Sequence, residues 1–263
     1  METTKPTEAP KAQAYTLAPR RPAPKVGMPK DGFWLLSGLA KQGKTTLSAS
    51  IPDAVILELE KGGADYVNGW VQEIPDLATL RLAFVAAVKD PKVKAIVVDT
   101  LDVVLDWLAD EVAEKYGLDS MTEKKEGVNG FEVWDALTRK VSILISSFKH
   151  CDKLVVALAH FKEPKLNKDG RLVITSAINA PTGKIGSYIC SHADAIGICS
   201  KEKVGSKMQY KISFEGGGPI GAFGSRVPDL ENKTITLPDT NQWAAIEALF
   251  KVPANGKTDK GGK

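Results

Sequence analysis

A chain of 263 residues with 43% hydrophobic content is long enough for one large α/β domain or two small ones. Its three cysteines form no Cys-x-x-Cys pair and its three histidines show no ligand spacing, which argues against structural zinc and a disulfide framework and favours a reducing compartment. No apolar run approaches the roughly 20 residues that span a bilayer, and the N-terminus lacks an apolar signal core. We therefore expect a cytoplasmic protein with no membrane partner.

The net charge of +3 is unevenly distributed along the chain. Residues 1–30 carry six basic side chains against two acidic ones, and residues 251–263 carry four lysines against one aspartate, which leaves a net charge of −4 between them. Both ends are poor in large apolar residues, so we predict a disordered basic tail over 1–30, a single domain over 31–251 and a second disordered basic tail over 252–263. The tails either serve solubility and linkage or tether nucleic acid electrostatically.

Predicted strands and helices alternate along the chain. Apolar runs predict strands over 33–37, 54–59, 94–99 and 153–159, and periodicity predicts helices over 43–50, 77–89 (capped by Asp76), 101–116 and 131–149. A long polar segment over 161–184 holds a short strand at 172–175, strands over 193–199 and 209–214 form a hairpin, and a helix over 241–251 follows. Continuous apolar strands separated by helices indicate an α/β fold with a mostly parallel sheet covered on both faces.

The first predicted strand leads into a glycine-rich stretch, Gly-Leu-Ala-Lys-Gln-Gly-Lys-Thr, that opens a helix. This is the Walker A pattern in the context that makes it meaningful. The glycines let the backbone wrap around phosphate groups, toward which loop amides and the helix N-terminus point positive dipoles. We expect bound ATP, with Lys44 at its β- and γ-phosphates and the Thr45 hydroxyl on Mg²⁺. The predicted nucleotide-binding residues are Gly38, Leu39, Ala40, Lys41, Gln42, Gly43, Lys44, Thr45 and Thr46.

Carboxylates end the next two buried strands. Asp99 closes an apolar run about fifty positions after the glycine loop, as expected of a Walker B residue that holds Mg²⁺, usually through water. An aspartate there can also simply cap the following helix. Glu58 and Glu60 end the second strand and, by strand alternation, point the same way. One of them would face the γ-phosphate as a general base, unless both are merely solvated at a strand edge.

Four stretches resemble the phage-encoded RecA-like ATPases, a family of AAA-domain or nucleotide-binding phage proteins that includes ATP-dependent single-strand annealing proteins: GLAKQGKTTLSASIPDAVILELEKGG, AIVVDTLD, GFEVWDAL and LVVALAHFKE. The resemblance covers roughly residues 33–237 and implies a RecA-like P-loop core with a C-terminal antiparallel hairpin. It implies that Glu60, in the context Glu58-Leu59-Glu60, is the catalytic glutamate. It also implies that the fourth strand lies between the Walker A and Walker B strands and that His160, at its end, is the γ-phosphate sensor. By pattern alone, the alternative is a histidine that simply ends a strand.

The same resemblance points to single-stranded DNA. The segment 161–184 corresponds in position to the second DNA-binding loop of RecA-like proteins and carries a net charge of +3. Its predicted DNA-binding residues are Lys162, Lys165, Lys168, Arg171 and Lys184. A solvated loop is the alternative. RecA-like oligomers often place a basic residue from a neighbouring subunit at the γ-phosphate, and Arg226 is the candidate, against an ordinary surface arginine. The implied partners are further copies of the chain, single-stranded DNA and a single-stranded-DNA-binding protein, in the cytoplasm of a phage host.

Together these features predict a DNA-stimulated ATPase that acts in phage recombination or annealing, with Lys44, Glu60, His160 and Arg226 as its catalytic residues. Two other classes share the glycine loop. A small-molecule kinase should carry an arginine-rich lid. The only arginines in residues 131–214 are Arg139 and Arg171. A scaffold that binds ATP with little hydrolysis is the second alternative.

Overall fold

The computed structural model describes residues 27–161, 165–166, 172–173, 176–215 and 224–250. Its strands are β1 (Gly32–Ser37), β2 (Ala54–Glu58), β3 (Trp70–Glu73), β4 (Ala95–Asp99), β5 (Leu154–Ala159), β6 (Lys165–Leu166), β7 (Leu172–Val173), β8 (Ala195–Val204), β9 (Lys207–Ser213), β10 (Gly224–Ser225) and β11 (Thr234–Leu237). Its helices are α1 (Lys44–Ala49), α2 (Leu77–Lys89), α3 (Leu101–Lys115), α4 (Gly130–His150), α5 (Gly183–His192) and α6 (Trp243–Glu247), followed by a 3₁₀ turn (Ala248–Phe250).

A nine-stranded sheet forms the centre of the fold, with the strand order β11-β9-β8-β1-β5-β4-β2-β3 and with β10 beside β8. The pairs from β3 to β8 are parallel, while β9, β10 and β11 join antiparallel. The predicted α/β class and mostly parallel sheet are confirmed. The fourth predicted strand, now β5, lies between the strand that enters the glycine loop and the strand that ends at Asp99, as the RecA-like resemblance implies.

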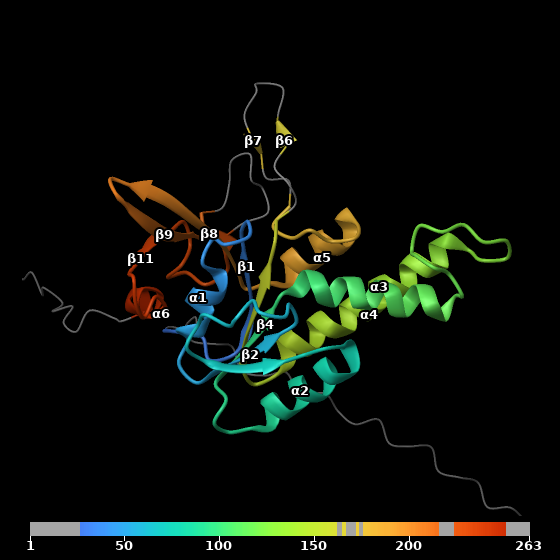
Figure 1. Cartoon of the computed structure of the whole chain (residues 1–263), viewed down its shortest axis with the longest axis horizontal. Coiled ribbons are helices and arrows are strands. Elements are labelled where there is room, and N and C mark those ends of the chain that lie inside the picture. Colours follow the sequence, from blue (N-terminus) through green and yellow to red (C-terminus); the bar gives the residue numbers. More distant parts are fainter. Residues whose placement is uncertain (1–26, 162–164, 167–171, 174–175, 216–223, 251–263) are drawn as a thin grey trace, which may run out of the picture.

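Side chains alternate between the two faces of the sheet along each strand, and a hydrophobic core lies on each face. On β1, Phe33 and Leu35 belong to the core beneath α2, α3, α4 and α5, whereas Trp34 and Leu36 belong to the core beneath α1 and α6. Successive side chains of a strand point to opposite faces, so a continuously apolar strand fills both cores. Figure 1 shows these two groups of helices on opposite sides of the sheet.

Several elements differ from the predictions. Helix α5 is unpredicted because Gly183 and Gly186 weaken its helical signal. A Cβ on Gly186 would lie 3.4 Å from Ala180 Cβ and from Ser176 Oγ, so the glycine permits close packing. Edge strand β3 is short and mostly exposed, and it carries no apolar run. The β8–β9 hairpin extends beyond the predicted strands, through most of the polar stretch that the sequence predicts as their connection.

The predicted tails fall largely outside the described residues, so their disorder and the domain limits at 31 and 251 stay predictions. Within the described ranges, no helix combines the length and apolar character needed to cross a membrane.

Candidate nucleotide-binding site

The glycine loop lies between β1 and α1 and packs against the β8–β9 hairpin. Gly43 has φ of +85°, a conformation that glycine adopts at no steric cost, and a Cβ there would lie 2.8 Å from Tyr210 Cδ1. A Cβ on Gly38 would lie 2.6 Å from the Cys199 carbonyl oxygen. The two glycines of the motif are therefore required by the loop conformation and by close approach of the hairpin.

The Lys44 side chain is buried beneath the glycine loop. Its Nζ donates to the carbonyl oxygens of Gly38 at 3.1 Å and Leu39 at 2.9 Å, so the ammonium lies inside the curve of the loop. Burial lowers the pKa of Lys44 below its ordinary value, and Cys199 and the carboxylates of Asp99, Asp102 and Glu60 act in the opposite direction. A cation held in this way is placed to pair with an anionic ligand in the loop.

Asp99 and Thr45 form the second feature of the site. Thr45 Oγ1 donates a 2.7 Å hydrogen bond to Asp99 Oδ2, although Asp99 ends β4 and Thr45 begins α1. Burial raises the pKa of the Asp99 carboxyl, opposed by the Thr45 hydrogen bond. Helix α3 has Thr100 as its N-cap residue, and the Asp99 carboxylate is bound to Thr45 rather than used as a cap. A hydroxyl and a carboxylate oxygen side by side are the hard oxygen donors that Mg²⁺ prefers, so these residues fit the implied ion.

The two glutamates after β2 occupy different environments. Glu58 is buried, and its Oε1 accepts a 2.6 Å hydrogen bond from the Ala64 backbone N–H, so the alternative that both are solvated is wrong. Glu60 lies beyond the end of the strand and is exposed, and its Oε1 accepts a 2.8 Å hydrogen bond from Thr100 Oγ1. Thr100 directly follows Asp99, so its hydroxyl holds Glu60 beside the predicted metal-binding residues.

His160 directly follows β5, the strand between β1 and β4. Its backbone N–H donates to Asp102 Oδ2 at 2.8 Å, and its ring Nδ1 lies 3.3 Å from the same oxygen. In the sheet register, Leu158 of β5 is opposite both Asp99 and Leu36. His160 is therefore at the same edge of the sheet as Asp99 and the glycine loop.

Parallel pairing thus gathers the sequence-predicted residues at the carboxyl ends of four neighbouring strands. The glycine loop follows β1, Glu60 follows β2, Asp99 ends β4 and His160 follows β5. Of the predicted DNA-binding residues, Lys184 is exposed in the first turn of α5, and only the backbone of Lys165 is described. Lys162, Lys168 and Arg171 lie outside the described residues.

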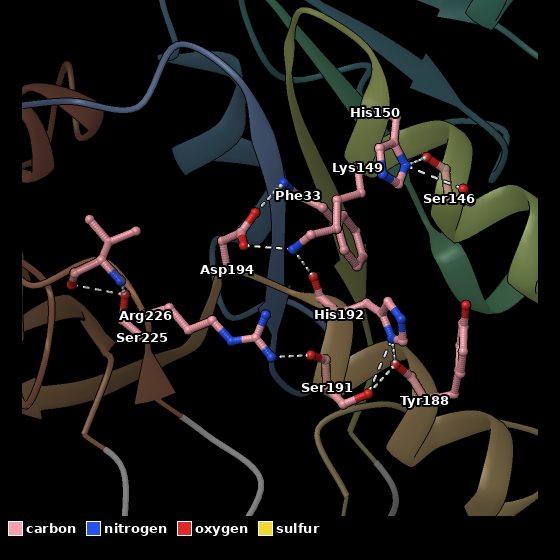
Figure 2. Close-up of polar contacts among 11 residues, drawn as sticks. Phe33, Ser146, Lys149, His150, Tyr188, Ser191, His192, Asp194, Ser225 and Arg226 are labelled. Atoms are coloured by element: carbon pink, nitrogen blue, oxygen red, sulfur yellow. Dashed lines mark hydrogen bonds and ion pairs between the residues drawn. The ribbon is translucent and has the colours of Figure 1, made fainter. Parts of the chain in front are cut away.

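Arg226 lies apart from this group. Its backbone N–H donates to the Asp194 carbonyl at 2.7 Å, and the Asp194 N–H donates to the Phe33 carbonyl at 2.7 Å. Its guanidinium donates to the Ser191 carbonyl, as Figure 2 shows. Because a strand rises about 3.3 Å per residue, Phe33 lies about 13 Å from the end of β1 that enters the glycine loop. Arg226 is thus at the opposite edge of the sheet from its own glycine loop.

Three contacts at the site were not predicted from the sequence. Tyr210 packs against Gly43, the Lys201 backbone N–H donates a 2.6 Å hydrogen bond to Gln42 Oε1, and Asp102 holds His160. The first two join segments that lie far apart in sequence, and no local pattern indicates them. Asp102 offered a weak signal, since it is a charged residue in an otherwise apolar first turn of α3.

The loop, its buried lysine and the adjoining carboxylate define a P-loop nucleotide-binding domain of the α/β class. A family model for the AAA domain matches residues 34–234, and the chain belongs to the AAA domain family. It is an ATPase domain of the AAA type. A solved structure whose title describes an ATPase domain is similar with a TM-score of 0.47 and 13% sequence identity, over 82% of this chain and 84% of that chain. No curated protein matches the sequence of this chain.

Proposed function

We propose that this protein hydrolyses ATP with Mg²⁺ and couples hydrolysis to single-stranded DNA in phage recombination or annealing. The observation that carries the ATPase half is the 2.7 Å hydrogen bond between Thr45 and Asp99, directly after a glycine loop that encloses Lys44. It brings the two predicted metal-binding oxygens together from separate parts of the chain.

Each residue has a defined role in this proposal. Lys44 neutralises phosphate charge, and Thr45 and Asp99 hold the metal ion. Mg²⁺ bound there supplies further neutralisation of charge on the phosphates. Glu60 acts as the general base for the attacking water, because it is the exposed carboxylate of the pair and Thr100 fixes one of its oxygens. Glu58 is excluded from this role by its burial and by its bond to the Ala64 backbone.

The substitutions Glu60→Gln and Glu58→Gln make a matched test, since they are the same chemical change two residues apart. Glu60→Gln should lower phosphate release at saturating ATP and Mg²⁺ by on the order of 100-fold, the range found for general bases, while ATP binding persists. Glu58→Gln retains an amide oxygen for the Ala64 N–H and should stay close to wild type. Equal phosphate release by Glu60→Gln and wild type would remove the catalytic role from Glu60.

The DNA half of the proposal rests on charge and position. The segment 161–184 leaves the sheet after β5, at the edge where the nucleotide would bind, and carries a net charge of +3. Basic side chains there would contact the phosphate backbone and release counterions on binding. A position beside His160 would let the nucleotide state influence those contacts.

Binding to labelled single strands across a salt series tests this half. With ATP and Mg²⁺ present, affinity should fall steeply with salt, and alanine at Lys162, Lys165, Lys168, Arg171 and Lys184 together should flatten the slope. Lys89→Ala, an exposed lysine that ends α2, is the control and should leave the slope unchanged. No binding at low salt would refute the DNA role and leave the ATPase proposal intact. Deleting residues 1–30 and 252–263 in the same assay measures what the basic tails add.

Arg226 belongs to the proposal only as a residue that a neighbouring subunit supplies, because its own glycine loop lies at the other edge of the sheet. Mixing Arg226→Ala subunits with Glu60→Gln subunits tests this directly. If Arg226 acts on the neighbouring site, the mixture contains interfaces with both Glu60 and Arg226 and should recover activity that neither variant has alone. Absence of recovery would make Arg226 an ordinary surface arginine.

A further inference from the structure

One carboxylate lies against two nitrogens of His160, one of the backbone and one of the ring. Asp102 Oδ2 accepts a 2.8 Å hydrogen bond from the His160 backbone N–H and lies 3.3 Å from its ring Nδ1. The Asp102 side chain is 16% exposed and the His160 side chain 33% exposed, so the contact is largely shielded from solvent. The His160 carbonyl in turn accepts a 2.7 Å hydrogen bond from the Asn179 N–H. The backbone of His160 is therefore fixed on both sides.

An aspartate at position 102 costs more free energy than a purely structural contact to the His160 N–H would require. Its other oxygen, Oδ1, is buried and has no hydrogen-bond partner among the described residues. A buried acceptor without a partner costs free energy, and an asparagine or serine would serve the backbone N–H without burying a charge. The carboxylate also lies close enough to Lys44 to influence its ammonium. These features place Asp102 in the polar group at the carboxyl edge of the sheet.

We infer that Asp102 is the positioning residue for His160: it holds the ring with Nδ1 protonated and turned toward the carboxylate, leaving Nε2 free to accept a hydrogen bond at the reacting end of the nucleotide. This inference rests on the proposed ATPase function. A carboxylate beside one ring nitrogen selects the tautomer that donates to it, and the other nitrogen then becomes the functional one. The 3.3 Å separation exceeds an ordinary hydrogen bond, as catalytic contacts often do without substrate, and we expect it to shorten when the site fills.

The tautomer determines what His160 contacts. In a neutral ring with its proton on Nδ1, Nε2 is an acceptor and cannot donate to a phosphate oxygen. Its fitting partner is a donor, the water that attacks the γ-phosphate. Asp102 and His160 thus orient the water that Glu60 deprotonates, and His160 is a water-orienting residue rather than a direct phosphate sensor.

Nitrogen-15 NMR of the imidazole rings tests the tautomer without reference to activity. The chain has only three histidines, so His160→Gln assigns the signal. At alkaline pH, wild-type His160 should show a protonated Nδ1 and a bare Nε2. Asp102→Ala should shift the ring toward the opposite tautomer, whereas Asp102→Asn, which retains an acceptor oxygen, should not. The same tautomer in wild type and Asp102→Ala would overturn the inference.

A double-mutant cycle on ATP hydrolysis tests whether Asp102 acts through His160. Asp102→Ala and His160→Gln should each lower kcat about 10-fold or more with little change in KM for ATP, and the double variant should be no slower than His160→Gln alone. Asp102→Asn should restore most of kcat, and thermal melting of each variant excludes misfolding. Additive losses in the double variant would overturn the inference. An inactive wild-type protein would instead refute the ATPase proposal, and the NMR result would still decide the tautomer.

Discussion

Thr45 Oγ1 and Asp99 Oδ2 lie 2.7 Å apart, within a hydrogen bond that joins residues 54 positions apart in the chain. The contact depends on the order of strands, because β1, which leads to Thr45, is separated from β4 by β5. A buried carboxylate is costly unless a donor or a cation accompanies it. Burial raises the pKa of the Asp99 carboxyl, and the Thr45 hydrogen bond and the charge of Lys44 oppose this shift, so a cation bound beside the carboxylate would stabilise its charged form.

The first prediction concerns this pair. Thr45→Val and Asp99→Asn should each lower Mg²⁺-dependent ATP hydrolysis by about 10- to 100-fold, the range for groups that support a metal ion, with the global fold retained. Titration of hydrolysis with Mg²⁺ measures the effect as a raised metal requirement. Asp110→Asn, at an exposed position of helix α3, which follows Asp99, is the control and should match wild type. An unchanged Mg²⁺ requirement in Asp99→Asn would contradict the assignment.

The second prediction concerns the left-handed glycine. Gly43→Ala should lower both thermal stability and ATP affinity, because alanine at φ of +85° costs about 1–2 kcal/mol and its Cβ would meet the Tyr210 ring. Adding Tyr210→Ala should relieve the collision but not the backbone strain, so recovery should be partial. Gly183→Ala is the control, since a Cβ there has no atom within 4 Å. Thermal melting and nucleotide titration measure both effects, and full recovery in the double variant would show that backbone strain is negligible.

Local sequence patterns predicted the parts of the fold and of the site that depend on near neighbours in the chain. The glycine loop, the strand that ends at Asp99 and the cap of α2 by Asp76, which accepts from the Thr79 N–H at 2.7 Å, are all set by neighbours along the chain. Placement of β5 beside β1 required the family resemblance, because periodicity gives no strand order. The prediction that Glu58 and Glu60 point the same way assumed that both lie in one strand. Strand β2 ends at Glu58, so the alternation of side chains along the strand does not extend to Glu60.

What could not be predicted depends on tertiary contacts. Asp102 and the His160 N–H are 58 positions apart, and Gln42 and the Lys201 N–H are 159 apart. Helix α5 contains two glycines and several residues of high strand propensity, so its packing, and not its intrinsic preference, determines its conformation.

The third prediction separates stability from nucleotide binding. Asp194 Oδ1 accepts from Lys149 Nζ at 2.7 Å and its Oδ2 accepts from the Phe33 N–H at 3.1 Å, which joins α4 to the start of β1 (Figure 2). Asp194→Ala leaves both donors without this partner and should lower the free energy of unfolding by about 1–3 kcal/mol. KM for ATP should not change, because the contact is at the opposite edge of the sheet from the glycine loop. Asp239→Ala, at an exposed position, is the control in urea unfolding, and a raised KM in Asp194→Ala would contradict this separation.

The fourth prediction concerns acid stability and the carboxylate that joins three helices. Glu111 on α3 accepts from the Arg81 guanidinium of α2 at 3.1 and 2.9 Å and from Lys140 Nζ of α4 at 2.7 Å. The Arg81 hydrogen bonds, with help from Lys140, lower the pKa of Glu111 from 4.5 to about 2. A carboxyl whose pKa is lower in the folded state stabilises the fold above its ordinary pKa, and this contribution declines as the pH falls from 4.5 towards about 2.

Glu111→Gln should therefore destabilise the protein near neutral pH and cease to do so in acid. The Glu111 side chain is 36% exposed and that of Arg81 53%, so solvent screening limits the loss at pH 7 to about 1 kcal/mol or less. Urea unfolding of wild type and variant from pH 7 to the acid limit of folding measures the difference, which should narrow below pH 4.5. Glu114→Gln, at an exposed position of the same helix, should show no such trend. A difference that stayed constant across the range would show that the variant acts through lost packing and not through lost charge.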